Sequence, residues 1–330
     1  MSAAASKHIP VLRERCLELL AGAGGSGVII DGTLGMGGHS EAILAHTDYA
    51  VVGIDRDPQA IALATERLAP YGDRFTTVHT TYDHIADIAA STGPVRGILM
   101  DLGVSSLQLD SDDRGFAYSR NTPLDMRMDT DGPRTAADIL AQASVGELTR
   151  ILRVYGEERA ASRIAAAIVR ERESAPITTT GQLADLIDRH MPAPARRSGG
   201  NPAKRTFQAL RIAVNSELSI LAQALPQAVD ALDIGGRLVV MSYHSLEDRL
   251  VKAVISQGTQ VDAPAGLPII PDDAQPYLRA LTRGAEKASS EEIERNPRSA
   301  PVRLRAAEKL HPAPAHRNHL EYDQVKEKTR

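Results

Sequence analysis

The stretch from Val28 to Ser40 reads VIIDGTLGMGGHS, a short apolar run that ends in an acid and opens into a glycine-rich loop. Its four glycines, at positions 32, 35, 37 and 38, permit a tight turn and a close approach of the backbone to a ligand. A helix that begins near Ser40 would point its N-terminal amides at that ligand. The stretch therefore predicts a strand, a ligand-binding turn and a helix, the opening of an α/β sheet.

Two further apolar runs downstream also end in an aspartate. They are Ala50–Asp55 (AVVGID) and Val95–Asp101 (VRGILMD), with a weaker strand candidate at residues 74–78. Residues 58–69 have helical apolar spacing, and Asp57 is a suitable N-cap for them. Strands that alternate with helices pair in parallel and are covered on both faces, so the sequence predicts an α/β protein.

The alternation of strands and helices stops after about residue 130. Residues 135–232 have a helical pattern without a convincing strand, and GGRLVVMSY at residues 235–243 restores a strand. A helix is expected at residues 245–255, with Ser245 as its N-cap and Asp248 three residues later. Two late strands are expected at residues 278–282 and 302–305.

This pattern predicts a Rossmann-like parallel sheet that is interrupted by an all-helical insertion. The expected parts are the first portion of the sheet domain at residues 1–130, the insertion at 131–215, the second portion at 216–306 and a disordered tail at 307–330. Pro and Gly predict a mobile loop at residues 192–200, inside the insertion, and a second loop at residues 257–276.

The composition excludes several classes of protein. The 330 residues carry a net charge of −4 and are 42% apolar, which are ordinary globular proportions. Cys16 is the only cysteine, so no internal disulfide forms and a reducing cytoplasm is the expected location. No apolar run approaches about 18 residues and no signal-peptide layout is present, so no membrane is expected as a partner. Neither paired cysteines nor an HExxH motif occurs, so no metal is expected.

The charge is distributed unevenly along the chain. Between Ala137 and Asn215 there are 12 Arg and Lys against 8 Asp and Glu, a net charge of +4, so the rest of the chain carries −8. Residues 190–211 contain five basic residues and no acid, which favours contact with phosphates over a merely solvated face. The candidates for RNA contact are Arg196, Arg197, Lys204 and Arg205.

The glycine loop and the acids at the strand ends together indicate a ligand that contains a nucleoside. Asp55 lies 24 residues beyond Asp31, where an acid can accept hydrogen bonds from both ribose hydroxyls. The glycine spacing is neither G-x-G-x-x-G nor that of a P-loop. Asp31 would repel a pyrophosphate but suits the ammonium and sulfonium of S-adenosylmethionine. Ligands of open α/β sheets bind at the carboxyl ends of the strands, so Asp31, Asp55 and Asp101 should all lie on the ligand-binding edge.

Several long blocks resemble the ribosomal RNA small subunit methyltransferase H family, also called MraW. These blocks are DGTLGMGGHS, GIDRDPQAI, DLGVSSLQLD, RGFAYSRNTPLDMRMD, YGEERAASRIAAAIV, KRTFQALRIAVNSEL and SYHSLEDR, spread between about His8 and Arg305. The resemblance implies a class I methyltransferase fold and transfer of a methyl group from S-adenosylmethionine to N4 of a cytidine in small-subunit (16S) ribosomal RNA, near the decoding centre. It implies the small ribosomal subunit as partner, with no DNA partner expected.

The resemblance also assigns residues to the cofactor. In place of the family's usual Phe, Tyr82 would pack near the adenine, and Leu107 replaces a common Pro beside one expected contact. The residues carried over as cofactor contacts are Gly37, Gly38, His39, Asp55, Tyr82, Asp101 and Gln108.

Methyl transfer to cytosine N4 needs alignment and an acceptor for the amine protons. The candidates lie in the loop 103–106, which contains Ser105, and at the strand end 242–245, which contains His244. His244 and Ser245 could instead only cap the following helix. Aromatic side chains usually hold an extruded base, and the candidates here are Phe116, Tyr118, Phe207 and Tyr243, with a core position expected for Phe207.

Two other functions stay open at this point. A nicotinamide-dependent oxidoreductase could use a similar sheet, although the glycine spacing, Asp31 and the basic insertion count against it. A non-catalytic RNA-binding factor could also keep the fold, although the three strand-end acids argue against decay of the site.

Overall fold

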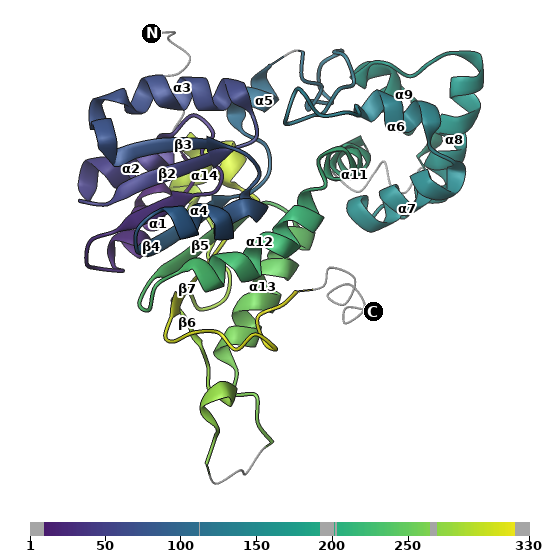
Figure 1. The fold of residues 1–330 in the computed structure, drawn as a ribbon. Coiled ribbons are helices and arrows are strands. Elements are labelled where there is room, and N and C mark those ends of the chain that lie inside the picture. The colour runs from purple at the N-terminus through teal and green to yellow at the C-terminus, as the bar shows by residue number, and fades with distance from the viewer. Residues whose placement is uncertain (1–9, 112, 192–200, 202, 265–268, 321–330) are drawn as a thin grey trace. The chain divides into compact units, whose positions relative to one another are not determined.

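The computed structural model describes residues 10–111, 113–191, 201, 203–264 and 269–320. Their contacts divide the chain into two compact units (Figure 1). The sheet unit consists of the chain up to Gly103 and from Leu218 onward, and the helical unit consists of Val104–Glu217. Among the described residues, no helix combines the length and the apolar character needed to cross a membrane.

A seven-stranded sheet forms the centre of the sheet unit, in the order β3-β2-β1-β4-β5-β7-β6. The first five strands pair in parallel, and β7 runs antiparallel to β5 and β6. The strands are β1 (Val28–Asp31), β2 (Ala50–Asp55), β3 (Phe75–His79), β4 (Val95–Asp101), β5 (Arg237–Ser242), β6 (Leu278–Ala280) and β7 (Arg303–Lys309). The strand order reverses between β1 and β4, which is where open α/β sheets bind ligands.

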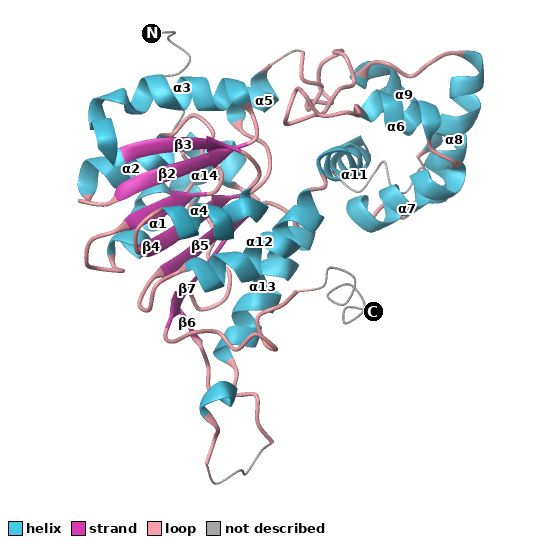
Figure 2. Ribbon diagram, in the orientation of Figure 1, coloured by secondary structure: helices cyan, strands magenta, loops and turns pink. Residues whose placement is uncertain are grey.

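Helices cover both faces of this sheet (Figure 2). On one face α1 (Arg13–Ala21), α2 (Gly38–His46) and α3 (Pro58–Leu68) bury alternate strand residues such as Ile29 and Leu99. The opposite face carries α4 (Ile85–Ser91), α12 (Glu217–Ala231) and α13 (Ser245–Thr259). Asp248 of α13 pairs with Arg303 and Arg305 there, and Lys309 donates to carbonyls at the end of α12. The chain also forms α14 (Ser290–Arg295).

The helical unit has no strand among its described residues, apart from an isolated bridge between Pro123 and Thr179. Capping boxes start four of its described helices, at Ser105, Thr135, Ser144 and Thr179, because each hydroxyl accepts the third amide N–H. Its helices are α5 (Ser106–Asp110), α6 (Ala136–Gln142), α7 (Val145–Gly156), α8 (Ala161–Ser174), α9 (Thr180–His190) and α11 (Ala203–Asn215).

The predicted class, a Rossmann-like α/β sheet with a helical insertion, is confirmed, but the sheet is mixed and not wholly parallel, because β7 runs antiparallel to β5 and β6. The bounds of β1, β2 and β4 are those expected, and β3, β5, β6 and β7 lie within a few residues of their predicted ranges. Asp57 is the N-cap of α3 and accepts from the amide of Gln59 at 3.0 Å. The helix α13 continues to Thr259, so the loop expected from residue 257 begins later. The predicted mobile loop at 192–200 lies outside the described residues.

The expected start of the helical unit differs from the structure. The helical unit begins at Val104 and not at residue 131, because Phe116, Leu124 and Met126 are buried in its core. Drawn at these limits it holds 16 basic and 15 acidic residues, a net charge of +1, so the predicted charge of +4 belongs to a narrower segment.

The structure describes residues 307–320 of the segment that was expected to be a disordered tail. Strand β7 continues to Lys309. Arg317 is 3% exposed, and its guanidinium donates to the carbonyls of residues 257, 260, 273 and 275. These bonds, which the sequence pattern does not indicate, tie the chain after β7 to the sheet unit.

Candidate cofactor site at the carboxyl edge of the sheet

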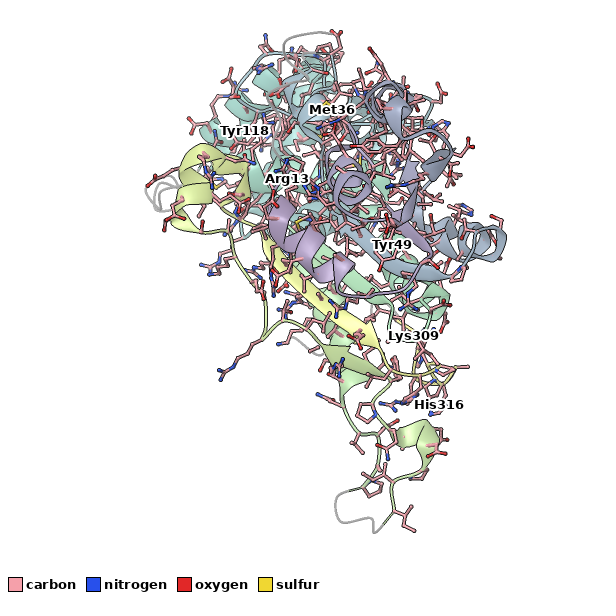
Figure 3. The ribbon with its side chains drawn as sticks, turned by 90° about the vertical axis from the view of Figure 1, so that its left-hand side faces the viewer. Arg13, Met36, Tyr49, Tyr118, Lys309 and His316 are labelled. Carbon is pink, nitrogen blue, oxygen red and sulfur yellow. The ribbon has the colours of Figure 1, made fainter. Side chains whose placement is uncertain are left out.

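Two residues of the glycine loop must be glycine, because the structure leaves no space for a side chain at either position. Gly37 is the N-cap of α2 with φ of 75°, and a Cβ there would lie 2.9 Å from Leu68 Cδ1. A Cβ on Gly38 would lie 2.5 Å from Pro10 Cγ. The loop follows the end of β1, whereas Tyr49 precedes β2, so Met36 and Tyr49 mark opposite edges of the sheet (Figure 3).

Asp31 holds this loop together. Its side chain is 1% exposed, and it accepts from the Ser40 hydroxyl at 2.7 Å and from the Thr33 amide at 3.2 Å. Burial raises the pKa of its carboxyl, and the His39 ring and the Ser40 hydroxyl oppose that shift. Both of its oxygens therefore have partners within the loop, which gives Asp31 a structural role, and its expected place beside a cationic ligand stays a prediction.

Asp55 also receives backbone amides. The amide of Gly35 donates to one carboxylate oxygen at 2.8 Å, and the amide of Asp57 donates to the other at 2.9 Å. Burial raises the pKa of this carboxyl to about 6, against the lowering effect of the two amide bonds. The residue is half-buried at the end of β2. Its role as ribose acceptor stays a prediction.

Asp101, at the end of β4, has a partly exposed carboxylate. Its backbone amide donates to Thr33 Oγ1 at 2.6 Å, and the Tyr243 hydroxyl donates to its Oδ1 at 2.7 Å. The side chain is 26% exposed, and Oδ2 lies 3.6 Å from His39 Nε2. That nitrogen is buried and has no hydrogen-bond partner within the described part of the chain. At this edge a carboxylate oxygen and a ring nitrogen therefore lie side by side, each without a hydrogen-bond donor or acceptor among the described residues.

The other expected cofactor residues fall into different environments. Tyr82 lies next to the loop, since a Cβ on Gly32 would be 3.4 Å from Tyr82 Cβ. Gln108 belongs to the helical unit, where it is buried. It forms a capping box with Ser105: the Ser105 hydroxyl accepts from the Gln108 amide, and Gln108 Oε1 accepts from the Ser105 amide at 3.1 Å. These bonds give Ser105 and Gln108 a structural role at the start of α5.

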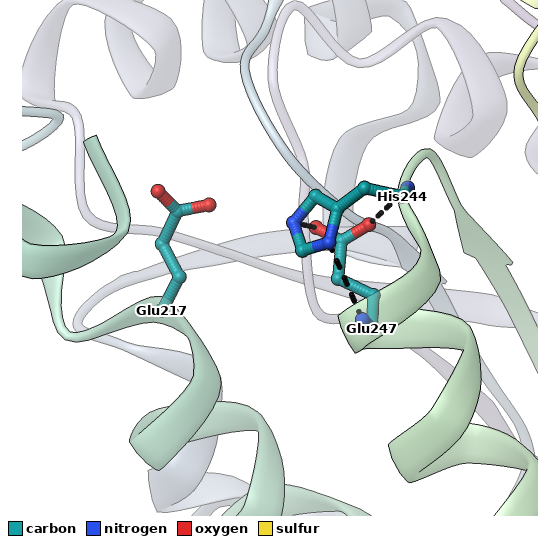
Figure 4. Close-up of side chains that lie close together, drawn as sticks. All are labelled: Glu217, His244 and Glu247. Atoms are coloured by element: carbon teal, nitrogen blue, oxygen red, sulfur yellow. Dashed lines mark hydrogen bonds and ion pairs between the residues drawn. The ribbon is translucent and has the colours of Figure 1, made fainter. Parts of the chain in front are cut away.

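At the start of α13 the N-cap is His244 and not Ser245. His244 Nδ1 accepts from the Glu247 amide at 3.4 Å, and the Glu247 carboxylate accepts from the His244 amide (Figure 4). The same carboxylate also accepts from the Tyr243 amide. Asp248 pairs with the arginines of β7 and does not cap. His244 Nε2 lies 3.1 Å from the second Glu247 oxygen. His244 and Glu247 have the spacing of a capping box, and this pair lies one residue before the predicted pair, Ser245 and Asp248.

Three of the four candidate aromatic residues lie in the core of the helical unit. Phe116 and Phe207 are buried, and the Tyr118 ring meets Phe207 edge to face with centroids 5.8 Å apart. The core position expected for Phe207 is confirmed, and Phe116, a candidate to hold a base, is a core residue as well. Tyr243 is the one of the four that reaches the acidic edge.

Two of the four candidate RNA contacts can be examined. Lys204 and Arg205 are exposed on α11. Arg211, in the same basic segment, is instead held by Glu217 at 2.9 Å and is not available to a phosphate in this arrangement. Arg196 and Arg197 lie outside the described residues.

The sequence matches the MraW methylase family over residues 5–310. The chain belongs to this family. It is 58% identical over 317 residues to the ribosomal RNA small subunit methyltransferase H of Beutenbergia cavernae, covering 94% of this chain and 95% of that one. It is 58% identical to the enzyme of the same name from Saccharopolyspora erythraea, covering 93% and 94% of the two chains.

Structural similarity to solved proteins is lower. The chain has a TM-score of 0.41 and 13% identity to an rRNA methylase from Streptococcus thermophilus, covering 91% of this chain and 94% of that one. Membership of the MraW methylase family rests on the sequence match and identifies a methyltransferase with S-adenosylmethionine as its cofactor, as expected. The alternative of a nicotinamide-dependent oxidoreductase is therefore wrong.

Proposed function

We propose that this chain transfers a methyl group from S-adenosylmethionine to the exocyclic N4 of a cytidine in small-subunit ribosomal RNA, near the decoding centre. Family membership supports the coarser statement, an rRNA methyltransferase of the small subunit. The cytosine, its N4 atom and its location are inferred from the sequence resemblance.

The observation that carries the proposal is the acidic edge at the point where the strand order reverses. The glycine loop, Asp55 and Asp101 meet there, and the orphaned nitrogen of His39 and oxygen of Asp101 fit a cationic ligand with hydrogen-bonding groups. Asp55 would hold the ribose, Tyr82 would pack on the adenine, and Asp101 would face the cationic methionyl end. When bound, S-adenosylmethionine supplies a methyl group on an already activated sulfonium.

The protein's own contribution to the reaction is mainly alignment, followed by removal of a proton from the methylated amine. His244, at the end of β5, is the candidate for that proton: its Nδ1 accepts the Glu247 amide, so the ring would take up the proton on Nδ1 and that long bond of 3.4 Å would open. A neutral imidazole can accept a proton, and a carboxylate at 3.1 Å would stabilise the imidazolium that results. The other candidate, Ser105, is less suited, since its hydroxyl already accepts the Gln108 amide.

The helical unit would supply contacts to the RNA backbone. Lys204 and Arg205 are exposed on one helix, and the segment that contains them has no acid. The small ribosomal subunit is the partner that follows from this proposal, with neither DNA nor a membrane involved, and a cytoplasmic location stays a prediction.

The decisive experiment is transfer of a tritiated methyl group to small subunits from cells that lack this protein, followed by nucleoside analysis of the digested rRNA. The expected product is N4-methylcytidine at a single site. Label in another nucleoside would contradict the proposed acceptor, and the absence of any transfer would favour a non-catalytic RNA-binding factor.

A further inference from the structure

We propose that Tyr243 is a positioning residue whose hydroxyl fixes the Asp101 carboxylate to receive the positive charge of the cofactor. The inference rests on the proposed cofactor role of the acidic edge. It adds Tyr243, which directly follows β5, to a site otherwise formed at the ends of β1, β2 and β4.

A comparison of the three strand-end acids leaves Asp101 for this task. Asp31 and Asp55 each have hydrogen-bond donors from the protein on both carboxylate oxygens. Asp101 has one such donor, the Tyr243 hydroxyl on Oδ1, and within the described residues nothing donates to its Oδ2. The Asp101 side chain is 26% exposed, and its Oδ2 has no hydrogen-bond donor among the described residues. This oxygen can therefore accept a hydrogen bond from an ammonium group or lie beside a sulfonium.

Tyr243 is built to donate and not to ionise. Burial, followed by the charge of Asp101, raises the pKa of its phenol well above 10, so the hydroxyl keeps its proton at neutral pH. Its backbone is fixed as well, because the Tyr243 amide donates to Glu247 Oε2 at 2.7 Å. Glu247 in turn is 2% exposed within the cap of α13.

Asp101 is thus held at two points, one on its backbone and one on its carboxylate. Its own amide is bound to Thr33 of the glycine loop at 2.6 Å, and its Oδ1 is bound to Tyr243. A hydrogen bond on one oxygen removes the rotation about the carboxylate axis and directs the other oxygen outward. Without the hydroxyl, Asp101 would sample other rotamers, or turn toward His39, before the cofactor binds.

The test is a double-mutant cycle on S-adenosylmethionine affinity, measured by calorimetry on the full chain. Tyr243→Phe keeps the ring and removes only the hydroxyl, and is expected to raise Kd about five- to tenfold. In an Asp101→Ala background the same substitution should raise Kd less than twofold, because a residue that acts through Asp101 has nothing left to orient. Asp101→Asn replaces the alanine variant if that variant does not fold.

The matched control is Tyr49→Phe. Tyr49 is also buried in the sheet unit, with its hydroxyl on the Gly24 carbonyl at 3.0 Å, but it lies at the opposite edge of the sheet, so Kd should not change. An unchanged Kd for Tyr243→Phe, or an equal increase in both backgrounds, would overturn the inference. Since the cycle measures cofactor binding alone, it does not depend on the rRNA acceptor, which methyl transfer by the unmodified protein tests separately.

Discussion

At the scale of single residues, three aspartates that look alike in sequence have different tasks. Each ends a parallel strand, but their hydrogen bonds differ. Asp31 accepts from the Ser40 hydroxyl within the glycine loop, and Asp55 accepts from two backbone amides. Asp101 accepts from Tyr243 on one oxygen only. The difference comes from the neighbours of each carboxylate. Only Asp55 combines partial exposure with a pKa near neutrality, at about 6, so its charge changes within an accessible pH range.

Asp55→Asn should weaken S-adenosylmethionine binding and remove part of its pH dependence. A ribose hydroxyl donates best to the ionised carboxylate, so affinity of the unmodified protein should fall as the pH drops below about 6, and stay level above it. The loss can approach about tenfold per pH unit. At about pH 8 the variant should bind about 1.5–3 kcal/mol more weakly, the range for a hydrogen bond to a charged group.

Calorimetry between about pH 5 and pH 8 measures both effects, and the comparison of the two proteins cancels other titrating groups, including Asp31, whose pKa is also raised. Parallel pH profiles for the two proteins would show that Asp55 is not the ribose acceptor.

At the scale of elements, the start of each helix beside the site depends on a local feature. The helix α2 begins at Gly37 with a positive φ, and α13 begins at the capping box of His244 and Glu247. In both cases residues of the expected site also serve the architecture, so a loss of activity on mutation needs a control that separates the two roles.

Gly37→Ala should destabilise the sheet unit by more than Gly24→Ala. Both glycines have positive φ, 75° and 65°, so both variants carry a backbone cost of about 1–2 kcal/mol. Only Gly37 lacks space, with Leu68 at 2.9 Å, which adds about 1–3 kcal/mol of overpacking, whereas nothing lies within 4 Å at Gly24. Urea unfolding measures the difference. Equal destabilisation would mean that the loop relaxes around the new methyl group.

His244→Asn separates the capping role of His244 from its proposed role as proton acceptor. Asn is a good N-cap, so the variant should unfold within about 0.5 kcal/mol of the unmodified protein, whereas His244→Ala should lose about 0.5–2 kcal/mol. Methyl transfer by His244→Asn should still be slower by a factor of about 100 or more, because an amide cannot accept the proton. Full activity of the asparagine variant would reduce His244 to a cap.

At the scale of the whole molecule, the net charge of −4 does not attract RNA over a distance. The helical unit is itself nearly neutral at +1. We therefore expect contact with phosphates from the short basic segment at residues 190–211.

Replacing Lys204 and Arg205 by Glu should lower methylation of small subunits by at least about tenfold and leave S-adenosylmethionine affinity unchanged, since each lost phosphate contact weakens salt-dependent binding. The matched control reverses Arg159 and Arg163, which are also exposed in the helical unit and give the same charge change. Steady-state rates at two salt concentrations and calorimetry provide the measurements. Equal losses for the two double variants would show that net charge alone matters, and weaker cofactor binding would indicate misfolding.

Assembled small subunits, or late precursors, should be methylated much faster than protein-free rRNA of the same sequence. Few phosphates can be neutralised and few aromatic side chains are free to stack on bases, since Phe116 and Phe207 are buried. Specificity then has to come from a shaped surface. Rates on both substrates at near-physiological salt measure this, and equal rates would mean that the RNA sequence alone suffices.

The sequence by itself determined the α/β class, the strand ends and the family. Strands such as Val28–Asp31 and Val95–Asp101 could be predicted to the residue because a buried parallel strand is a continuous apolar run, a local property. The glycine loop and the N-cap Asp57 are likewise local signals.

Only the tertiary structure decided which polar groups meet. Tyr243 and Asp101 are 142 residues apart in the chain and are joined because β4 pairs with β5. The same holds for the burial of Phe116, the true start of the helical unit and the anchoring of Arg317. Hydrogen-bond partners and core packing depend on strand order and helix docking, which residue spacing along the chain does not encode, so the division of tasks among the three aspartates could be assigned only from the fold.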